Sequence, residues 1–329
     1  MNCDQIQDWL THIGDLCKST NRKLDSRKIL TESALKTHIL INYLNANFDD
    51  LELCQPIIAQ LLALYYRLGV LRCFVLQLMP SIIHLYLVTL AKKWKKCTEL
   101  FELFFLAIYN EEILEGGTGS PSMTKRVDEI RIPSVTRFPS VYHDPSRLVA
   151  TSDSSKFTAA SGGNALACVQ NTVRIGPYPA VDRIIAENRY IVLTRILRVV
   201  NNTLSQMCSE VVCRHLCLSL TSICKSGFSF GESDFRQRVL GEDASDELFG
   251  DFARKPRVVV SSYFLIESLN GVNYALFNGH ADVALRALEA IHRRAHFEIF
   301  PDVLLQTNAL RNSLLDTQTV RMLFDSQRK

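Results

Sequence analysis

The sequence lacks a large excess of charge of one sign, and it lacks a hydrophobic run near its N-terminus. Its 329 residues include 37 basic and 34 acidic side chains, a net charge of +3. The chain as a whole therefore has no general attraction for nucleic acid or acidic substrates. The first ten residues, MNCDQIQDWL, contain an acidic side chain at once and no apolar core of a secretory signal. Ten cysteines without such a signal indicate free thiols in a reducing compartment. We expect a cytoplasmic protein without nucleic-acid partners.

The sequence also lacks a complete catalytic or nucleotide-binding motif. GFSFG, at 227–231, has the G-x-S-x-G spacing of a nucleophile elbow around Ser229. That elbow needs a strand before the serine, whereas a helix is expected here, so we interpret Gly227 as a helix C-cap. GGTGSPSMTK, at 116–125, has no Gly-Lys-Ser/Thr ending to cradle phosphates. We expect no catalytic residue and no cofactor, with a Ser229 hydrolase as the alternative.

Metal-binding spacings are missing as well. Four cysteines crowd one predicted helix, at Cys208, Cys213, Cys217 and Cys224. Their spacings differ from the C-x₂-C pairs of zinc sites, and the last three fall on one helix side, which favours core packing. His292 and His296 stand four residues apart, but two arginines separate them and no carboxylate partner is evident. We expect a solvated face there, and no metal site in the chain.

The hydrophobic pattern predicts an all-α fold. Apolar residues recur at the roughly 3.6-residue spacing of amphipathic helices over most of the chain. The predicted helices cover 4–17, 31–46, 50–68, 70–114 as three helices, 179–206, 208–227, 257–277, 281–298 and 301–316. Weak alternation of apolar and polar residues at 126–132 and 167–175 predicts a small two-stranded β element.

These elements predict one compact domain of antiparallel helix pairs over residues 1–329. It has N-terminal helices at 1–114, an extended or β insertion at 115–178, C-terminal helices at 179–316 and a short tail at 317–329. Within the C-terminal helices, the charged and turn-rich segment 232–256 is predicted to be a surface excursion. NYALFNGHADVALRALEAI, at 273–291, looks like one helix–turn–helix unit of the tetratricopeptide kind, which predicts an antiparallel helix pair.

Residues 70–90 have the length and apolar character of a membrane-spanning helix. The segment nevertheless contains Arg72, Gln77, Pro80, Ser81 and His84. A charge near the centre of such a span costs about 2.5–3.5 kcal/mol on insertion, and proline suggests a break. We prefer two short buried helices here. The lysines that follow, 92–96 around Trp94, are interpreted as a solvated helix end, with contact to acidic lipid as the alternative.

A proline-rich ribbon lies near the middle of the chain. RIPSVTRFPSVYHDPS, at 131–146, carries a proline every six residues, which excludes a helix. It also carries large apolar side chains, among them Phe138, Val141 and Tyr142. Burial of such a side chain contributes about 1.5–3 kcal/mol, enough to offset much of the cost of ordering. We expect the ribbon to lie in a groove between helices, with His143 as a satisfied polar cap.

The same ribbon carries a family resemblance. FPSVYHDPS, at 138–146, resembles the Pro-Ser-Val-Tyr-His-acid-Pro-Ser signature of the hyccin family. The resemblance continues in GPYP at 176–179, in AENRYIVLTRILRVVNNTL at 186–204 and over 260–314, and spans about residues 36 to 315. The motif positions that carry over, as structural or partner-contact residues, are Pro139, Ser140, Val141, Tyr142, His143 and Pro145.

The resemblance implies a function that the composition does not. Hyccin-like proteins are mostly α-helical, non-catalytic subunits of the phosphatidylinositol 4-kinase alpha complex at the plasma membrane. They bind a tetratricopeptide-repeat scaffold protein, the pair holds the kinase, and a separate palmitoylated protein anchors the assembly. The resemblance thus implies an adaptor without a cofactor, recruited peripherally to the plasma membrane. The alternative is a helical protein-interaction module unrelated to lipid kinases.

Overall fold

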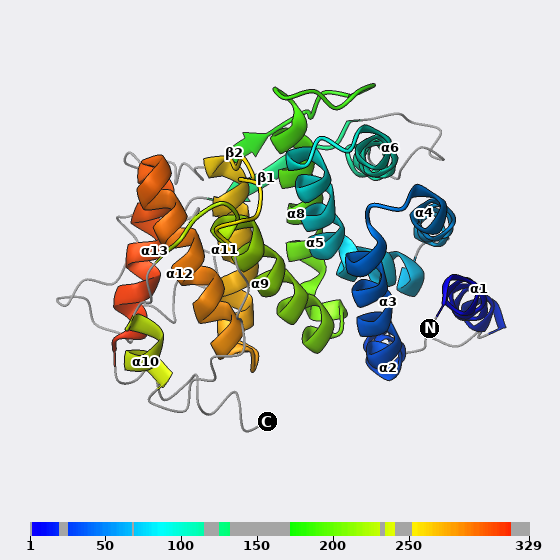
Figure 1. Ribbon diagram of the computed structural model, residues 1–329, viewed down its shortest axis with the longest axis horizontal. Helices are drawn as coiled ribbons and strands as arrows, with labels where there is room; N and C mark the ends of the chain where they lie inside the picture. The colour runs from blue at the N-terminus through cyan, green and yellow to red at the C-terminus, as the bar shows by residue number, and fades with distance from the viewer. Residues whose placement is uncertain are drawn as a thin grey trace, which may run out of the picture. The chain divides into compact units, whose positions relative to one another are not determined.

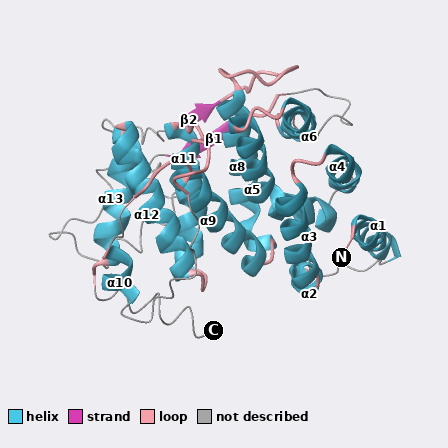
Figure 2. Cartoon of the chain, in the orientation of Figure 1, coloured by secondary structure: helices cyan, strands magenta, loops and turns pink. Residues whose placement is uncertain are grey.

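The computed structural model describes residues 2–19, 26–67, 69–114, 125–131, 172–230, 234–240 and 252–316. The chain divides into two compact units, the first formed by Met1–Asn110 with Val181–Lys329 and the second by Glu111–Ala180. Helices make up most of the described residues, as Figures 1 and 2 show, so the predicted all-α fold is confirmed.

The N-terminal part of the first unit is a series of helices. They are α1 (Cys3–Ser19), α2 (Ser26–Glu32), α3 (Ala34–Asn47), α4 (Leu51–Tyr65), α5 (Gly69–Ala91) and α6 (Lys95–Glu112). The apolar stripe predicted on α1 is buried at Ile6, Trp9, Leu10 and Ile13. The stripe predicted over 31–46 is partly wrong, because the chain breaks between α2 and α3 and Leu35 points into solvent.

The helix α4 begins at a side-chain cap. The Asp50 carboxylate accepts hydrogen bonds from the backbone N–H groups of Glu52, at 2.9 Å, and Leu53, at 3.4 Å. This is the usual way for aspartate to satisfy the first free donors of a helix. Pro56 lies in the second turn of the helix. The helix ends at Tyr65, earlier than predicted, and Gly69 opens the next helix with φ +62°.

The helix α5 is the centre of the first unit. It runs unbroken over 23 residues with Pro80 inside it, so the prediction of two short helices was wrong. Among the described residues it is the one helix long and apolar enough to cross a membrane, and 83% of that apolar window is buried within the fold. It contacts α4, α8 and α9. This cover on several sides stabilises a helix that has lost one backbone hydrogen bond at the proline.

The C-terminal part of the first unit packs onto α5. Its elements are α8 (Arg189–Thr203), a 3₁₀ turn (Leu204–Gln206), α9 (Ser209–Lys225), α10 (Phe235–Leu240), α11 (Ser262–Phe277), α12 (Ala281–Glu298) and α13 (Pro301–Leu314). The helix predicted from 179 begins at Arg189 and the one predicted from 257 begins at Ser262, whereas α12 and α13 match their predicted positions closely. α9 contacts α5, α11 and α12, and α12 lies beside α13 (Figure 1). Of the predicted surface excursion 232–256, residues 234–240 form a short helix with Phe235 and Val239 buried, whereas Ala253, Arg254 and Lys255 are exposed.

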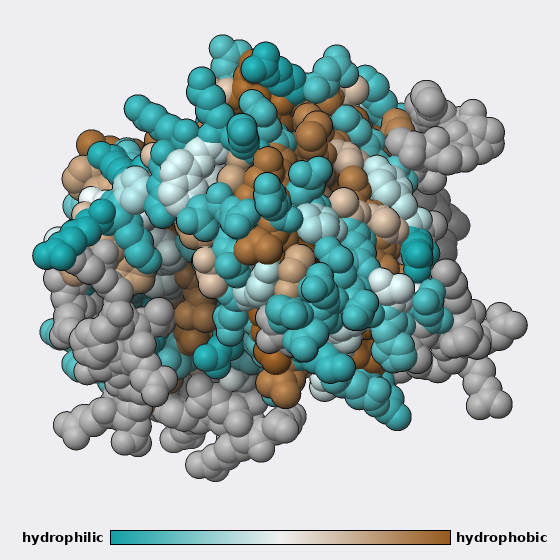
Figure 3. Space-filling view, turned by 45° about the vertical axis from the view of Figure 1, so that its right-hand side comes forward, coloured by the Kyte–Doolittle hydropathy of each residue, from teal (hydrophilic) through white to brown (hydrophobic). Residues whose placement is uncertain are grey.

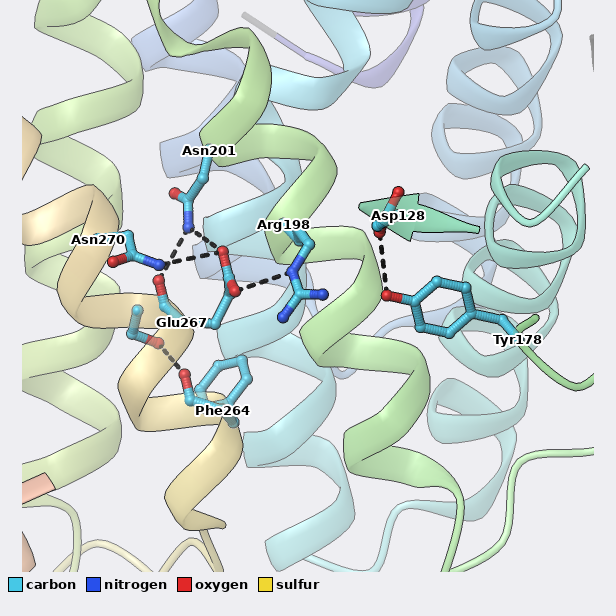
Figure 4. A network of polar contacts seen from close by, with 8 residues as sticks. Asp128, Tyr178, Arg198, Asn201, Phe264, Glu267 and Asn270 are labelled. Carbon is cyan, nitrogen blue, oxygen red and sulfur yellow. Dashed lines mark hydrogen bonds and ion pairs between the residues drawn. The ribbon is translucent and has the colours of Figure 1, made fainter. Parts of the chain in front are cut away.

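The second unit contains the two predicted strands. β1 (Asp128–Arg131) pairs antiparallel with β2 (Thr172–Ile175), with Asp128 opposite Ile175. The Tyr178 hydroxyl donates to the Asp128 carboxylate at 3.0 Å, just beyond the end of β2 (Figure 4). The prediction of a two-stranded element at these positions is confirmed.

Candidate functional site

The motif positions of the proline-rich ribbon, Pro139, Ser140, Val141, Tyr142, His143 and Pro145, lie outside the described residues. Their predicted packing and partner contacts therefore stay predictions. The candidate sites below come from the described helices of the first unit.

Ser229 lacks the setting of a nucleophile. The helix α9 precedes it, and the serine is exposed in the irregular segment that follows. Gly227 has φ +80° and donates its N–H to the Phe252 carbonyl at 2.9 Å, which confirms the interpretation of this glycine as the end of a helix. A Cβ at this position would lie 2.8 Å from the Cα of Arg257, so glycine is also required by space.

The cysteines of α9 are packing residues. Cys213, Cys217 and Cys224 are fully buried free thiols, as predicted. Burial raises the pKa of the Cys213 and Cys224 thiols to about 12, so both remain neutral. Within the described ranges, no group of three or more His, Cys, Asp or Glu side chains is placed to hold a metal ion.

A buried carboxylate joins α8 to α11 (Figure 4). Glu267 accepts hydrogen bonds from Arg198 Nε at 3.1 Å and from Asn201 Nδ2 at 2.8 Å. Asn201 also donates to the Glu267 backbone carbonyl, again at 2.8 Å. Both carboxylate oxygens are engaged by the protein, so this group is a structural tether between two helices.

The tether requires a close approach of three helices. A Cβ on Gly271, one turn beyond Glu267, would lie 2.3 Å from Leu216 Cδ2 on α9 and 2.9 Å from Asn201 Oδ1 on α8. Such distances are shorter than van der Waals contact, so the missing side chain is what lets α8, α9 and α11 pack together.

A buried arginine organises the end of α12. The fully buried Arg294 donates to the Val258 carbonyl at 2.6 Å and to Glu298 Oε1 at 2.9 Å, and its guanidinium lies 4.4 Å from the Phe228 ring centroid. Arg257 donates to the same glutamate oxygen at 2.7 Å. Burial alone would raise the pKa of the Glu298 carboxyl, but the two arginines outweigh it and hold that pKa below its ordinary value. These contacts fix the segment before α11 along the C-terminal end of α12.

A shallow hollow of about 430 Å³, wide open to solvent, lies on the surface between α12 and α13. We call it the basic pocket, and its lining residues are Phe230, Glu289, His292, Arg293, His296, Phe297 and Arg311. The Thr307 hydroxyl donates to the Val303 carbonyl at 2.9 Å, so it accepts from His292 Nδ1, also at 2.9 Å. This bond holds the histidine ring in one orientation at the cavity wall. The predicted solvated face therefore has a concave centre, which the spacing of His292 and His296 alone did not reveal.

Exposed apolar side chains gather beside this pocket. We call Val259, Tyr263, Phe297 and Ile299 the apolar edge. Ile299 is 80% exposed, Tyr263 72% and Val259 71%. The contacts of Arg294 and Glu298 bring the segment that carries Val259 to the end of α12, where Ile299 follows directly. On the face shown in Figure 3, hydrophobic residues likewise reach the surface between hydrophilic ones.

The lysines of the turn after α5, Lys92, Lys93, Lys95 and Lys96, are all exposed to solvent, which confirms the predicted solvated helix end. The Lys92 ammonium lies 4.3 Å from the Trp94 ring centroid and 4.9 Å from that of Phe48. Such cation–π contacts hold the side chain against the protein. This lysine therefore contributes to the local packing between α3 and the turn.

A comparison with protein-family models identifies the family of the chain. The family model described as hyccin matches residues 26–326, nearly the whole sequence. The chain belongs to the hyccin family. The resemblance predicted from the sequence motifs is thus confirmed. In this hyccin-family chain the match extends from α2 past α13, and it includes the basic pocket and the apolar edge.

Proposed function

We propose that this hyccin-family chain is a non-catalytic adaptor of a phosphatidylinositol 4-kinase alpha complex. It binds a tetratricopeptide-repeat scaffold protein, and the pair stabilises the kinase for synthesis of phosphatidylinositol 4-phosphate at the plasma membrane. The protein is cytoplasmic and is recruited peripherally, through a separate palmitoylated anchor protein. The observation that carries the proposal is the family match over residues 26–326.

Exposed apolar side chains on α6 support a docking role. Leu103 on α6 is 68% exposed, and the Tyr66 hydroxyl donates to the Ala107 carbonyl, one turn further along the same helix face. Tyr66 is itself partly exposed. Together these side chains give α6 an outward apolar surface of the kind that partner helices cover.

Affinity purification of the tagged full chain, followed by mass spectrometry, tests the proposal. The expected partners are a tetratricopeptide-repeat protein and a phosphatidylinositol 4-kinase. Recovery of other partners without either of these would favour an interaction module unrelated to lipid kinases. A chain that purifies from cells as a monomer would contradict an adaptor role altogether.

A pair of matched variants then locates the contact. Leu103→Asp is expected to weaken co-purification of the repeat protein about tenfold or more, because it places a charge in an apolar interface. Leu35→Asp is the control, since Leu35 on α3 is an equally exposed leucine at 73%. Equal losses for the two variants would show that the α6 surface is not the docking site.

A further inference from the structure

The helix α12 ends at a left-handed C-cap, in which the Phe300 N–H donates to the Ala295 carbonyl at 3.0 Å. Ile299 has φ 55° and ψ 53°, the left-handed conformation, directly after the helix. Glycine is the usual residue there because a β-branched side chain crowds the backbone in this conformation. The isoleucine side chain is 80% exposed, so it gains little burial in return. The cap accounts for the left-handed backbone but not for an exposed β-branched side chain at this position, and that choice of residue indicates a use outside the chain itself.

Three more exposed apolar residues lie at the same end of the pair formed by α11 and α12. Val259 and Tyr263 project from the segment before α11 and from its first turn, and Phe297 from the last turn of α12. α11 and α12 are joined by a short turn and lie antiparallel, so these side chains share one end of the helix pair. Single exposed apolar residues are ordinary, but a group of four at one end is a contact surface.

The charge beside this edge is positive. Four arginines meet two glutamates around the pocket and the end of α12: Arg257, Arg293, Arg294 and Arg311 with Glu289 and Glu298. Glu298 is shared by two of the arginines, and Arg311 Nε reaches Glu289 at 3.4 Å, too long for a well-formed hydrogen bond. Arg293 has no ion pair among the described side chains. Arg311 and Glu289 still form an ion pair, so this set has a net charge of +2 in which Arg293 is the arginine without a partner among the described residues.

We propose that the basic pocket and the apolar edge together form a contact site for an anionic phospholipid membrane. The headgroup phosphate enters the pocket, where Arg293 neutralises it beside the Arg311–Glu289 ion pair, and the Phe230 and Phe297 rings border it. Ile299, Val259 and Tyr263 enter the interface between headgroups and acyl chains. This arrangement combines the two terms that hold peripheral proteins on membranes, apolar insertion and attraction to anionic lipid.

The geometry favours a lipid surface over a peptide. The apolar side chains project from chain turns at the end of a helix pair, so they can enter a soft surface together. They do not line an elongated groove, which an extended or helical peptide would need. The pocket is built from two helices and one short segment, a size suited to a single headgroup. The site goes beyond the proposed adaptor role and requires no partner protein.

Vesicle flotation with the purified full chain tests the proposal. The vesicles contain phosphatidylcholine alone, phosphatidylcholine with phosphatidylserine, or phosphatidylcholine with phosphatidylinositol 4-phosphate. Binding is expected on both anionic vesicles, stronger with the phosphomonoester headgroup, and weaker as salt rises. Equal binding to neutral and anionic vesicles would overturn the proposal. Binding of a soluble inositol bisphosphate without vesicle binding would overturn it too, since that result assigns the pocket to a soluble ligand.

Two variants separate membrane contact from folding. Ile299→Gly is expected to keep or raise the thermal midpoint, because glycine relieves the backbone strain, yet to weaken vesicle binding about tenfold. Arg293→Ala is expected to weaken binding to anionic vesicles about fivefold. Leu35→Ala and Lys36→Ala, at exposed positions of α3, are the matched controls and should bind as the unmodified chain does. Unchanged vesicle binding by Ile299→Gly would overturn the proposal.

Discussion

Acidification to about pH 5 is expected to destabilise this fold through two histidines that are neutral in the folded state. His215 on α9 is buried, and its Nε2 lies 2.7 Å from His38 Nδ1 on α3. His84 on α5 lies between helices with its Nε2 2.9 Å from Ser222 Oγ. Burial is the larger cause and nearby positive charge the smaller, from His38 and Arg214 for His215 and from Lys255 for His84; together they lower the pKa of both rings to about 4.

The sign of the effect follows from proton binding. An unfolded chain protonates these rings near pH 6.5, whereas the folded protein does so only near pH 4. Between these values the unfolded state binds more protons, so stability is complete above pH 6.5 and falls as the pH drops toward 4. Near pH 5 the loss is about 2 kcal/mol for each histidine relative to neutral pH. His84 keeps part of its surface in contact with solvent, so we expect its share to be the smaller of the two.

Urea unfolding across this pH range measures the effect. The free energy of unfolding is determined for the unmodified chain, for His215→Gln and for His84→Gln. Each variant has a polar side chain that does not titrate, so the loss of stability on acidification should shrink by about 2 kcal/mol or less. His12→Gln, on the exposed face of α1, is the control and should lose as much stability on acidification as the unmodified chain. The reasoning would be refuted if the free energy of unfolding of the unmodified chain and of His215→Gln fell in parallel as the pH is lowered.

Three further substitutions test packing and capping. Gly271→Ala is expected to cost about 1–2 kcal/mol, because overpacking against α8 and α9 exceeds the gain in helix propensity; stability equal to or above that of the unmodified chain would contradict the close approach. Asp50→Ala is expected to cost about 1 kcal/mol in chemical unfolding, whereas Asp50→Asn should keep most of the cap; equal losses for both would point to charge rather than to the hydrogen bonds. Tyr142→Ala is expected to lower thermal stability by more than about 1 kcal/mol if the proline-rich ribbon packs as predicted, and a smaller loss would mean that it does not.

Periodicity predicted the C-terminal helices well because their apolar and polar faces differ clearly. α12 is the clearest case, with Ala284, Leu285 and Leu288 inside, although its charged residues Glu289 and Arg294 are buried as well. The paired strands were predicted from weak alternation at the correct positions. Local rules failed in α5, where Pro80 signals a break that does not occur. The helices that pack on α5 are distant from it in the sequence, so no local stretch of the sequence predicts these contacts.

The sequence contained only part of the candidate membrane site. The spacing of His292 and His296 was visible, but Arg311 and Phe230 come from other segments and meet them only in the folded chain. The contact between His292 and Thr307 likewise depends on how α13 lies against α12. Ile299 gave no signal at all, since its importance depends on a backbone angle that the residue type disfavours. Such features follow from tertiary structure, and local patterns do not report them.

The central position of α5 has a consequence for synthesis of the chain. Its N-terminal neighbour α4 is already made when α5 leaves the ribosome, but α8 and α9 follow only after about a hundred more residues. During that interval the most hydrophobic stretch of the protein has no partner on those sides, and it has the length that membrane-insertion machinery accepts. Correct folding therefore depends on shielding a nascent segment until the second half of the chain arrives.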